Sequence, residues 1–239
     1  MATKKTKTEE VKTTEETKVE TAVAADVETD AKDAKKTDKE IDLTNYPEVI
    51  RASLLKTKRE GMEDLLDFME ESGFFTAPCS GGNHLCKEGG LAEHSCNVMF
   101  TAEKMSVVLL GGKNITDEIR NSIVIAALLH DLGKVGDYGK QLYVENILKS
   151  GKRSDAKPFM RNKSLTNVPH AIRSIKLATL FIDLTEDEEW AVLTHDGLYD
   201  FMKYEIQGHE TWLSMLIHWA DMWSSHVVEG DSEEGKGDE

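Results

Sequence analysis

Apolar residues recur at intervals of three and four along most of the chain after Tyr46, which places them on one face of an α-helix. Thr116 has the form of an N-cap, and Thr185 with Glu188 has the form of a capping box. Strand patterns are too few for a central sheet, so the predicted class is all-α. Two helical pieces are expected on either side of Gly61, followed by helices over residues 91–110, 116–131, 169–181, 185–195 and 210–228.

Two stretches depart from the helical spacing. Residues 74–90 are rich in glycine and contain Pro78, which indicates a loop. Residues 138–164 carry two short apolar runs on either side of a polar turn around Gly151. That pattern predicts a small β-hairpin or an irregular insertion within the helical fold.

The last predicted helix carries Trp212, Trp219 and Trp223 near one face. Large aromatic side chains at helical spacing usually belong to a hydrophobic core. We therefore expect these tryptophans in the core and not in a cofactor site.

Both ends of the chain are charged and lack an apolar face. Residues 1–40 consist almost entirely of Lys, Thr, Glu, Asp, Ala and Val, and residues 229–239 are acidic and rich in glycine. Such segments bury too little apolar surface to offset the entropy lost on ordering. The sequence predicts disordered tails over 1–40 and 229–239 around one helical domain at 41–228.

Net charge, hydropathy and cysteine content limit the classes of partner and the cellular compartment that the sequence favours. A net charge of −15 argues against extended binding to nucleic acid or to an anionic membrane, although it permits a local site for a phosphorylated small molecule. No run of residues approaches the roughly 20 apolar positions of a membrane span, and the N-terminus lacks the apolar core of a signal peptide. Three cysteines fit a reducing compartment. We expect a soluble cytoplasmic protein, and a homo-oligomer is compatible with these features.

One predicted helix ends in a histidine and an aspartate. Seven apolar residues, 123–129, lead directly into His130 and Asp131, and Gly133 is suited to stop the helix. Burying an imidazole and a carboxylate is costly unless something binds them. Both groups are ligands for zinc, manganese or iron. For the dipeptide alone, a hydrogen bond at the helix end is the simpler interpretation.

Similar residues occur on the other predicted helices, each beside apolar neighbours. A single buried histidine is more often a core residue than a ligand, but six such groups on successive helices favour a metal centre. The six are His94, His130, Asp131, His170, His195 and Asp221.

The order His, His-Asp, His, His, Asp resembles the HD superfamily of metal-dependent phosphohydrolases. The segment Leu-Leu-His-Asp-Leu-Gly-Lys at 128–134 lies at its centre, and Gly-Gly-Leu-Ala-Glu-His-Ser at 89–95 precedes the first ligand. The second motif is similar to bacterial and phage HD hydrolases and to the HD domain of certain 3'–5' exoribonucleases. The resemblance covers about Phe74 to Glu229 and implies an all-α HD fold.

The resemblance also implies a dinuclear site. One metal would be held by His94, His130, Asp131 and Asp221, and a second with the help of His170 and His195. Asp131 would bridge the two ions. The expected cofactors are two divalent transition metals, such as manganese or iron, which would activate a water molecule for attack on a phosphate ester. Asp196 is a candidate partner for one of the imidazoles.

Three further residues are candidates for contacts with the substrate. Lys134 could neutralise a phosphate oxygen and so assist catalysis, or could cap the helix end as a surface lysine. Arg173 could reach the phosphate or be solvated. His84 lies in a loop where the resembling hydrolases often carry a histidine near the substrate. A structural zinc site at Cys79, His84 and Cys86 is less favoured, because the spacing matches no zinc ribbon.

The predicted function is hydrolysis of a phosphate ester, as a phosphomonoesterase or phosphodiesterase, in a nucleotide or related metabolite. The alternative is a mixed-valence diiron oxygenase, since some HD-fold oxygenases use the same ligands. A non-catalytic binding module is the least favoured class because the ligand set is complete. Exoribonuclease action is disfavoured by the acidic charge balance and by the absence of a nucleic-acid-binding pattern before the HD-like region.

Overall fold

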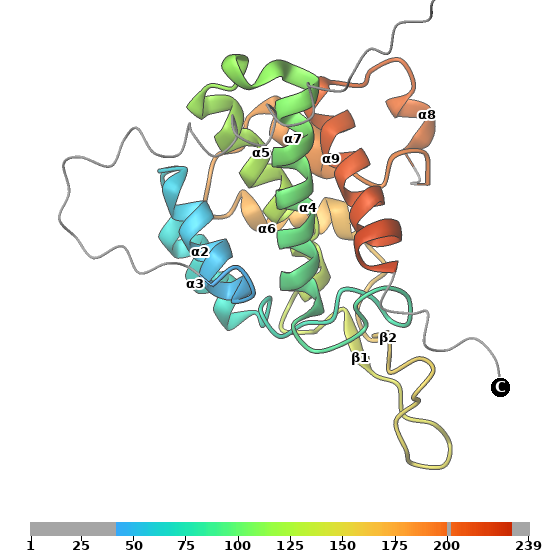
Figure 1. Cartoon of the computed structure of the whole chain (residues 1–239). Helices are drawn as coiled ribbons and strands as arrows, with labels where there is room; N and C mark the ends of the chain where they lie inside the picture. Colours follow the sequence, from blue (N-terminus) through green and yellow to red (C-terminus); the bar gives the residue numbers. More distant parts are fainter. Residues whose placement is uncertain (1–41, 200–201, 231–239) are drawn as a thin grey trace, which may run out of the picture. The chain divides into compact units, whose positions relative to one another are not determined.

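Helices are the predominant secondary structure of the residues that this computed structural model describes, which are 42–199 and 202–230 (Figure 1). The predicted all-α class is confirmed. Residues 1–40 and most of the predicted acidic tail lie outside the described residues, so their disorder remains a prediction. The helices are α2 (Tyr46–Lys56), α3 (Met62–Glu71), α4 (Gly90–Ser106), α5 (Asp117–Leu129), α6 (His170–Ala178), α7 (Glu186–Leu193), α8 (Lys203–Ile206) and α9 (Trp212–Trp223).

The helix starts follow the capping residues of the sequence. The Thr116 hydroxyl accepts a hydrogen bond from the Ile119 amide at the start of α5. Thr185 and Glu188 form the predicted capping box of α7. Short turns extend several helices or link them: η1 (Val107–Gly111), η2 (Gly112–Asn114), η3 (Leu132–Val135), η4 (Gly197–Tyr199) and η5 (Ser224–Val228).

The stretch between η3 and α6 contains the predicted hairpin. Strand β1 (Tyr143–Glu145) pairs antiparallel with β2 (Phe159–Arg161), and Val144 lies opposite Met160. None of the described helices is long and apolar enough to cross a membrane.

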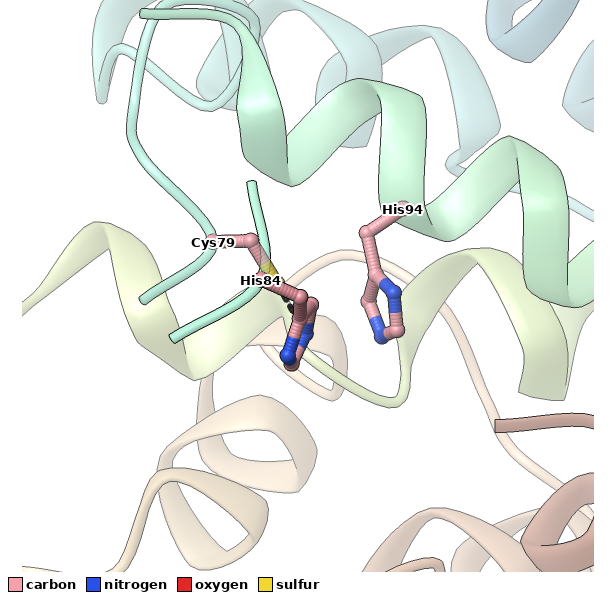
Figure 2. Close-up of side chains that lie close together, drawn as sticks. All are labelled: Cys79, His84 and His94. Carbon is pink, nitrogen blue, oxygen red and sulfur yellow. Dashed lines mark hydrogen bonds between the residues drawn. The ribbon is translucent and has the colours of Figure 1, made fainter. Parts of the chain in front are cut away.

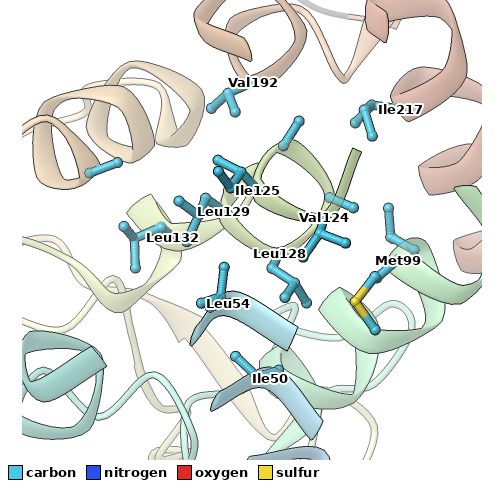
Figure 3. Close-up of a cluster of buried hydrophobic side chains, with 14 of the residues drawn as sticks. Ile50, Leu54, Met99, Val124, Ile125, Leu128, Leu129, Leu132, Val192 and Ile217 are labelled. Carbon is cyan, nitrogen blue, oxygen red and sulfur yellow. The ribbon is translucent and has the colours of Figure 1, made fainter. Parts of the chain in front are cut away.

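Helix α5 lies at the centre of the hydrophobic core (Figure 3). Every residue from Ile123 to Leu129 is buried, and α5 packs against α2, α4, α7 and α9. Full burial of one Leu or Ile side chain contributes about 1.5–3 kcal/mol, so several such residues hold α5 firmly in place. The C-terminal end of α5 is therefore a rigid platform for the side chains that follow it.

The prediction for the three tryptophans of α9 is wrong. Trp212, Trp219 and Trp223 are 38%, 37% and 54% exposed, whereas the core face of this helix carries Leu213, Leu216, Ile217 and Ala220. Because α9 is apolar on two faces, spacing alone does not indicate which face is buried.

Helix α6 approaches the turn after α5 so closely that only glycine fits between them. A Cβ atom on Gly133 would lie 2.1 Å from the His170 carbonyl oxygen and 2.7 Å from the Arg173 Cβ. Gly133 therefore does not stop α5, which ends at Leu129, but lies within η3 and admits the first turn of α6. The Ser174 hydroxyl joins the same elements, because it donates to the His130 carbonyl at 2.7 Å and accepts from the Gly133 amide at 2.8 Å.

We expect Gly133→Ala to lower the free energy of unfolding by about 1–3 kcal/mol, because the added methyl group overpacks this contact. Gly112→Ala is the matched control, since Gly112 has a φ of −52° and its nearest atom would be Val107 Cγ1 at 3.6 Å. Urea unfolding of both variants measures the difference. Equal midpoints would show that α6 can shift away from η3 without loss of stability.

Candidate metal centre

His130 and Asp131 follow the last residue of α5 and are almost completely buried. His130 Nδ1 lies 2.7 Å from the Ala127 carbonyl oxygen. A carbonyl only accepts, so Nδ1 carries the proton and Nε2 presents its lone pair on the other side of the ring. The backbone thus fixes both the tautomer and the orientation of this imidazole.

A first group of donor atoms forms where α4, the end of α5 and α9 meet. His94 Nε2 lies 3.3 Å from His130 Nε2 and 3.1 Å from Asp221 Oδ1. Asp131 Oδ2 lies 3.3 Å from His130 Nε2 and 3.6 Å from His94 Nε2. Residues from positions far apart in the sequence therefore surround one point.

A second group forms on the other side of Asp131. His170 Nε2 lies 3.0 Å from His195 Nε2, and Asp131 Oδ1 lies 3.2 and 3.6 Å from these two nitrogens. His195 donates its Nδ1 proton to the Val192 carbonyl at 2.7 Å, so its Nε2 atom faces inward. Asp196 completes the group, with Oδ2 lying 3.4 Å from His170 Nε2.

Asp131 thus presents one carboxylate oxygen to each group. Its Oδ1 has no hydrogen-bond partner within the described part of the chain, although it is buried. Burial would raise the pKa of Asp131, but the charges of Lys134 and His130 outweigh burial and hold the pKa well below its usual range. A buried carboxylate that stays ionised with a free lone pair is suited to bind a cation.

The spacing of the nitrogens also fits metal ions. Two nitrogens that bind one ion at about 2.1 Å lie about 3.0 Å apart at octahedral angles and about 3.4 Å apart at tetrahedral angles. The observed nitrogen pairs, at 3.3 Å in the first group and 3.0 Å in the second, match this range. Burial lowers the pKa of His195, but Asp131 and Asp196 outweigh it and raise that pKa to about 9. The carboxylates around His195 therefore favour positive charge in the second group.

Glu229 supports the first group, although it lies in the predicted acidic tail at 229–239. Its carboxylate accepts the Nδ1 proton of His94 at 3.0 Å and a hydrogen bond from Asn97 at 3.0 Å, and only 3% of the residue is exposed. This contact directs the Nε2 atom of His94 toward His130 and Asp221. Glu229 stands at the start of an acidic stretch, so no local pattern in the sequence marks it as part of the fold.

The three candidates for substrate contacts occupy different environments. Lys134 lies with Nζ 2.6 Å from Asp131 Oδ2, and both Lys134 and His84 line a cavity of about 450 Å³. Arg173 does not line this cavity, because it is buried and donates to the Val168 and Thr166 carbonyls at 3.1 and 2.5 Å. The sequence leaves two alternatives for Arg173, a phosphate contact and a solvated side chain. Neither describes the buried position of Arg173, whose hydrogen bonds hold the segment before α6. Among the described residues, the other cavity-lining groups include Asn83, His195, Asp196, Asp221 and Glu229.

Residues 91–197 match the family model described as the HD domain. This stretch of the chain is an HD domain. No curated protein and no solved structure matches the chain in the corresponding comparisons. The matched stretch of the HD domain contains both α5 and the histidines at 94, 130, 170 and 195, whereas Asp221 and Glu229 lie beyond it. An HD domain points to a metal-dependent hydrolase, and the groups described above are compatible with a metal site.

We expect Glu229→Ala to weaken metal binding about 10- to 100-fold, because His94 loses the carboxylate that orients it. Glu93→Ala is the matched control, since Glu93 precedes His94 on α4 but pairs with Lys87 at 2.7 Å. Manganese titration against a competing chelator measures the affinity of each variant. Equal affinities for the two variants would exclude the orienting role of Glu229.

Proposed function

We propose that this HD domain hydrolyses a phosphate ester of a nucleotide or a related phosphorylated metabolite, using two divalent transition metals. The observation that carries the proposal is the position of Asp131, whose two oxygens face two separate groups of histidines beside a cavity. A buried carboxylate with this placement is the ligand expected to bridge two cations.

The proposed ligands follow the two groups of donor atoms. His94, His130, Asp131 and Asp221 would hold one metal, while Asp131, His170 and His195 would hold the second, with Asp196 within reach. When bound, two such ions lower the pKa of a water molecule and neutralise charge on a phosphoryl group. The HD domain itself provides the fixed orientation of these donors, which the backbone carbonyls of Ala127 and Val192 enforce.

Lys134 and Asp196 are the proposed groups that act on substrate and water. The Lys134 ammonium lies beside both Asp131 and the cavity, so it can turn from the carboxylate to a phosphate oxygen. Asp196 lines the cavity and its side chain is 38% exposed, which suits it to accept a proton from an attacking water molecule. The cavity of about 450 Å³ is within the size range of small-molecule sites.

The function is tested by screening the manganese-loaded protein against a panel of nucleoside monophosphates, triphosphates and cyclic and linear diesters. We expect release of inorganic phosphate or of a nucleotide, and the product distinguishes a monoesterase from a diesterase. The panel includes an iron-loaded sample with an oxygen electrode, because an HD-fold oxygenase would use the same ligands. Oxygen uptake by the iron-loaded protein without hydrolysis of any ester would contradict the proposal.

Two substitutions separate the roles of neighbouring residues. We expect Asp131→Asn to reduce bound metal from about two ions per chain to one or fewer and to lower turnover by at least about 100-fold, because the neutral amide cannot bridge two cations. We expect Lys134→Ala to retain both metals and to lower kcat/KM about 100-fold through loss of one phosphate contact. Elemental analysis and turnover are measured on the same preparations.

Lys113→Ala is the control for the lysine substitution, since Lys113 is exposed in η2 and does not line the cavity. We expect it to match the unaltered protein in both measurements. Two bound metals and normal turnover in Asp131→Asn would exclude the bridging role. A metal content that stays near one in the unaltered protein would remove His170 and His195 from the proposed ligands.

A further inference from the structure

A third group of side chains that could hold a metal ion lies beside the first group and shares His94 with it. Cys79 and His84 come from the loop between α3 and α4, and they lie close to His94 on α4 (Figure 2). Cys79 Sγ lies 3.3 Å from His84 Nε2, and the rings of His84 and His94 are 4.9 Å apart. The donor atoms of all three residues lie within 4.8 Å of one another.

This spacing fits a thiolate-bound metal. A sulfur and a nitrogen that bind one tetrahedral zinc ion, at about 2.3 and about 2.1 Å, lie about 3.5 Å apart. The observed separation of Cys79 Sγ and His84 Nε2 is close to that value. This group differs from the disfavoured zinc site at Cys79, His84 and Cys86, because His94 and not Cys86 lies close to Cys79 and His84.

The loop that carries Cys79 and His84 is held rigidly in this position. The Cys79 amide donates to the Leu85 carbonyl at 3.2 Å, and the Ser80 hydroxyl donates to the His84 carbonyl at 2.7 Å. A Cβ atom on Gly90 would lie 2.1 Å from the Leu85 carbonyl oxygen, so the loop rests directly on the start of α4. The three donors are thus ordered by the backbone before any ligand binds.

The surrounding charges can accommodate a divalent cation. Lys134 Nζ lies 3.6 Å from Cys79 Sγ and would repel a metal. Two carboxylates oppose it, because Asp131 Oδ2 lies 4.0 Å from Cys79 Sγ and Glu229 Oε2 lies 3.7 Å from His84 Nε2.

His94 belongs to both the first and the third groups but can serve one metal at a time. Its Nδ1 proton is donated to Glu229, which leaves Nε2 as its ligand atom. That nitrogen also faces His130 and Asp221. One lone pair binds one ion, so a metal in one group excludes a separate metal in the other. The two groups differ in chemistry, because a thiolate favours soft ions and carboxylates favour harder ones.

We propose that Cys79, His84 and His94 form an alternative site for a thiophilic divalent cation of the zinc class, in competition with the site at His94, His130, Asp131 and Asp221. The competition rests on the proposed function in one respect, namely that His94 is a ligand of the hydrolytic metal. It does not depend on the identity of the substrate. A zinc-class ion in the alternative site removes His94 from the other ligands. The protein therefore distinguishes between hard and soft metals and loses the hydrolytic site when the soft metal binds.

Cobalt(II) tests the site directly, because a cobalt–thiolate bond produces a charge-transfer absorption in the near ultraviolet. We expect one equivalent of cobalt(II) to produce this band in the full-length protein and Cys79→Ser to lose it. We expect His84→Ala to weaken cobalt(II) binding at this site about 10-fold or more. Cys96→Ser is the matched control, because Cys96 is also buried but lies against the Tyr46 carbonyl, and it should retain the band.

Competition is measured with protein that first binds manganese and is then titrated with zinc. We expect zinc to release one manganese ion per chain from the unaltered protein, and to require at least about 10-fold more zinc to do so in Cys79→Ser or His84→Ala. The proposal is overturned by an absent cobalt band, by a band that survives in Cys79→Ser, or by equal manganese release in all variants. Melting curves of the metal-free variants identify any that fail to fold, in which case His84→Ala alone decides. Failure of these binding tests leaves the hydrolysis test unaffected, since ester turnover is measured separately.

Discussion

The buried negative charge of Asp131 is the constraint on which the rest of the site depends. An ionised carboxylate in a hydrophobic interior requires compensation, and here it lies among the imidazoles of His130, His170 and His195 and beside the Lys134 ammonium. The compensation comes from residues on different helices, so it exists only when those helices are packed together. The packing of the helices therefore both stabilises the charge of Asp131 and assembles the site.

Two features produce this packing: the rigid C-terminal end of α5 and the close approach of α6. The apolar residues of α5 fix the direction in which His130 and Asp131 leave the helix. Gly133 and Ser174 then bring the start of α6, with His170, against the same turn. The two groups of donors are thus linked through a few consecutive residues of the backbone.

Much of the fold could be predicted from the sequence, because helical spacing and capping residues act locally. Thr116, Thr185 and the hairpin strands appear where the patterns indicated. The contacts between residues far apart in the sequence could not be predicted in the same way. The exposed tryptophans of α9, the buried guanidinium of Arg173 and the buried carboxylate of Glu229 depend on which partner each meets in three dimensions. The candidate ligands could be chosen from their order and flanking residues, but their division into groups around Asp131 depends on how the helices pack in three dimensions.

The contact between His94 and Glu229 has a consequence for biosynthesis. These residues are 135 positions apart in the chain, and Asp221 also lies far beyond His94 in the sequence. A growing polypeptide therefore presents Cys79, His84 and His94 long before it can present Asp221 and Glu229. The donors of the proposed thiolate site are thus synthesised first, and the residues of the site at His94, His130, Asp131 and Asp221 are all present only after α9 has been added.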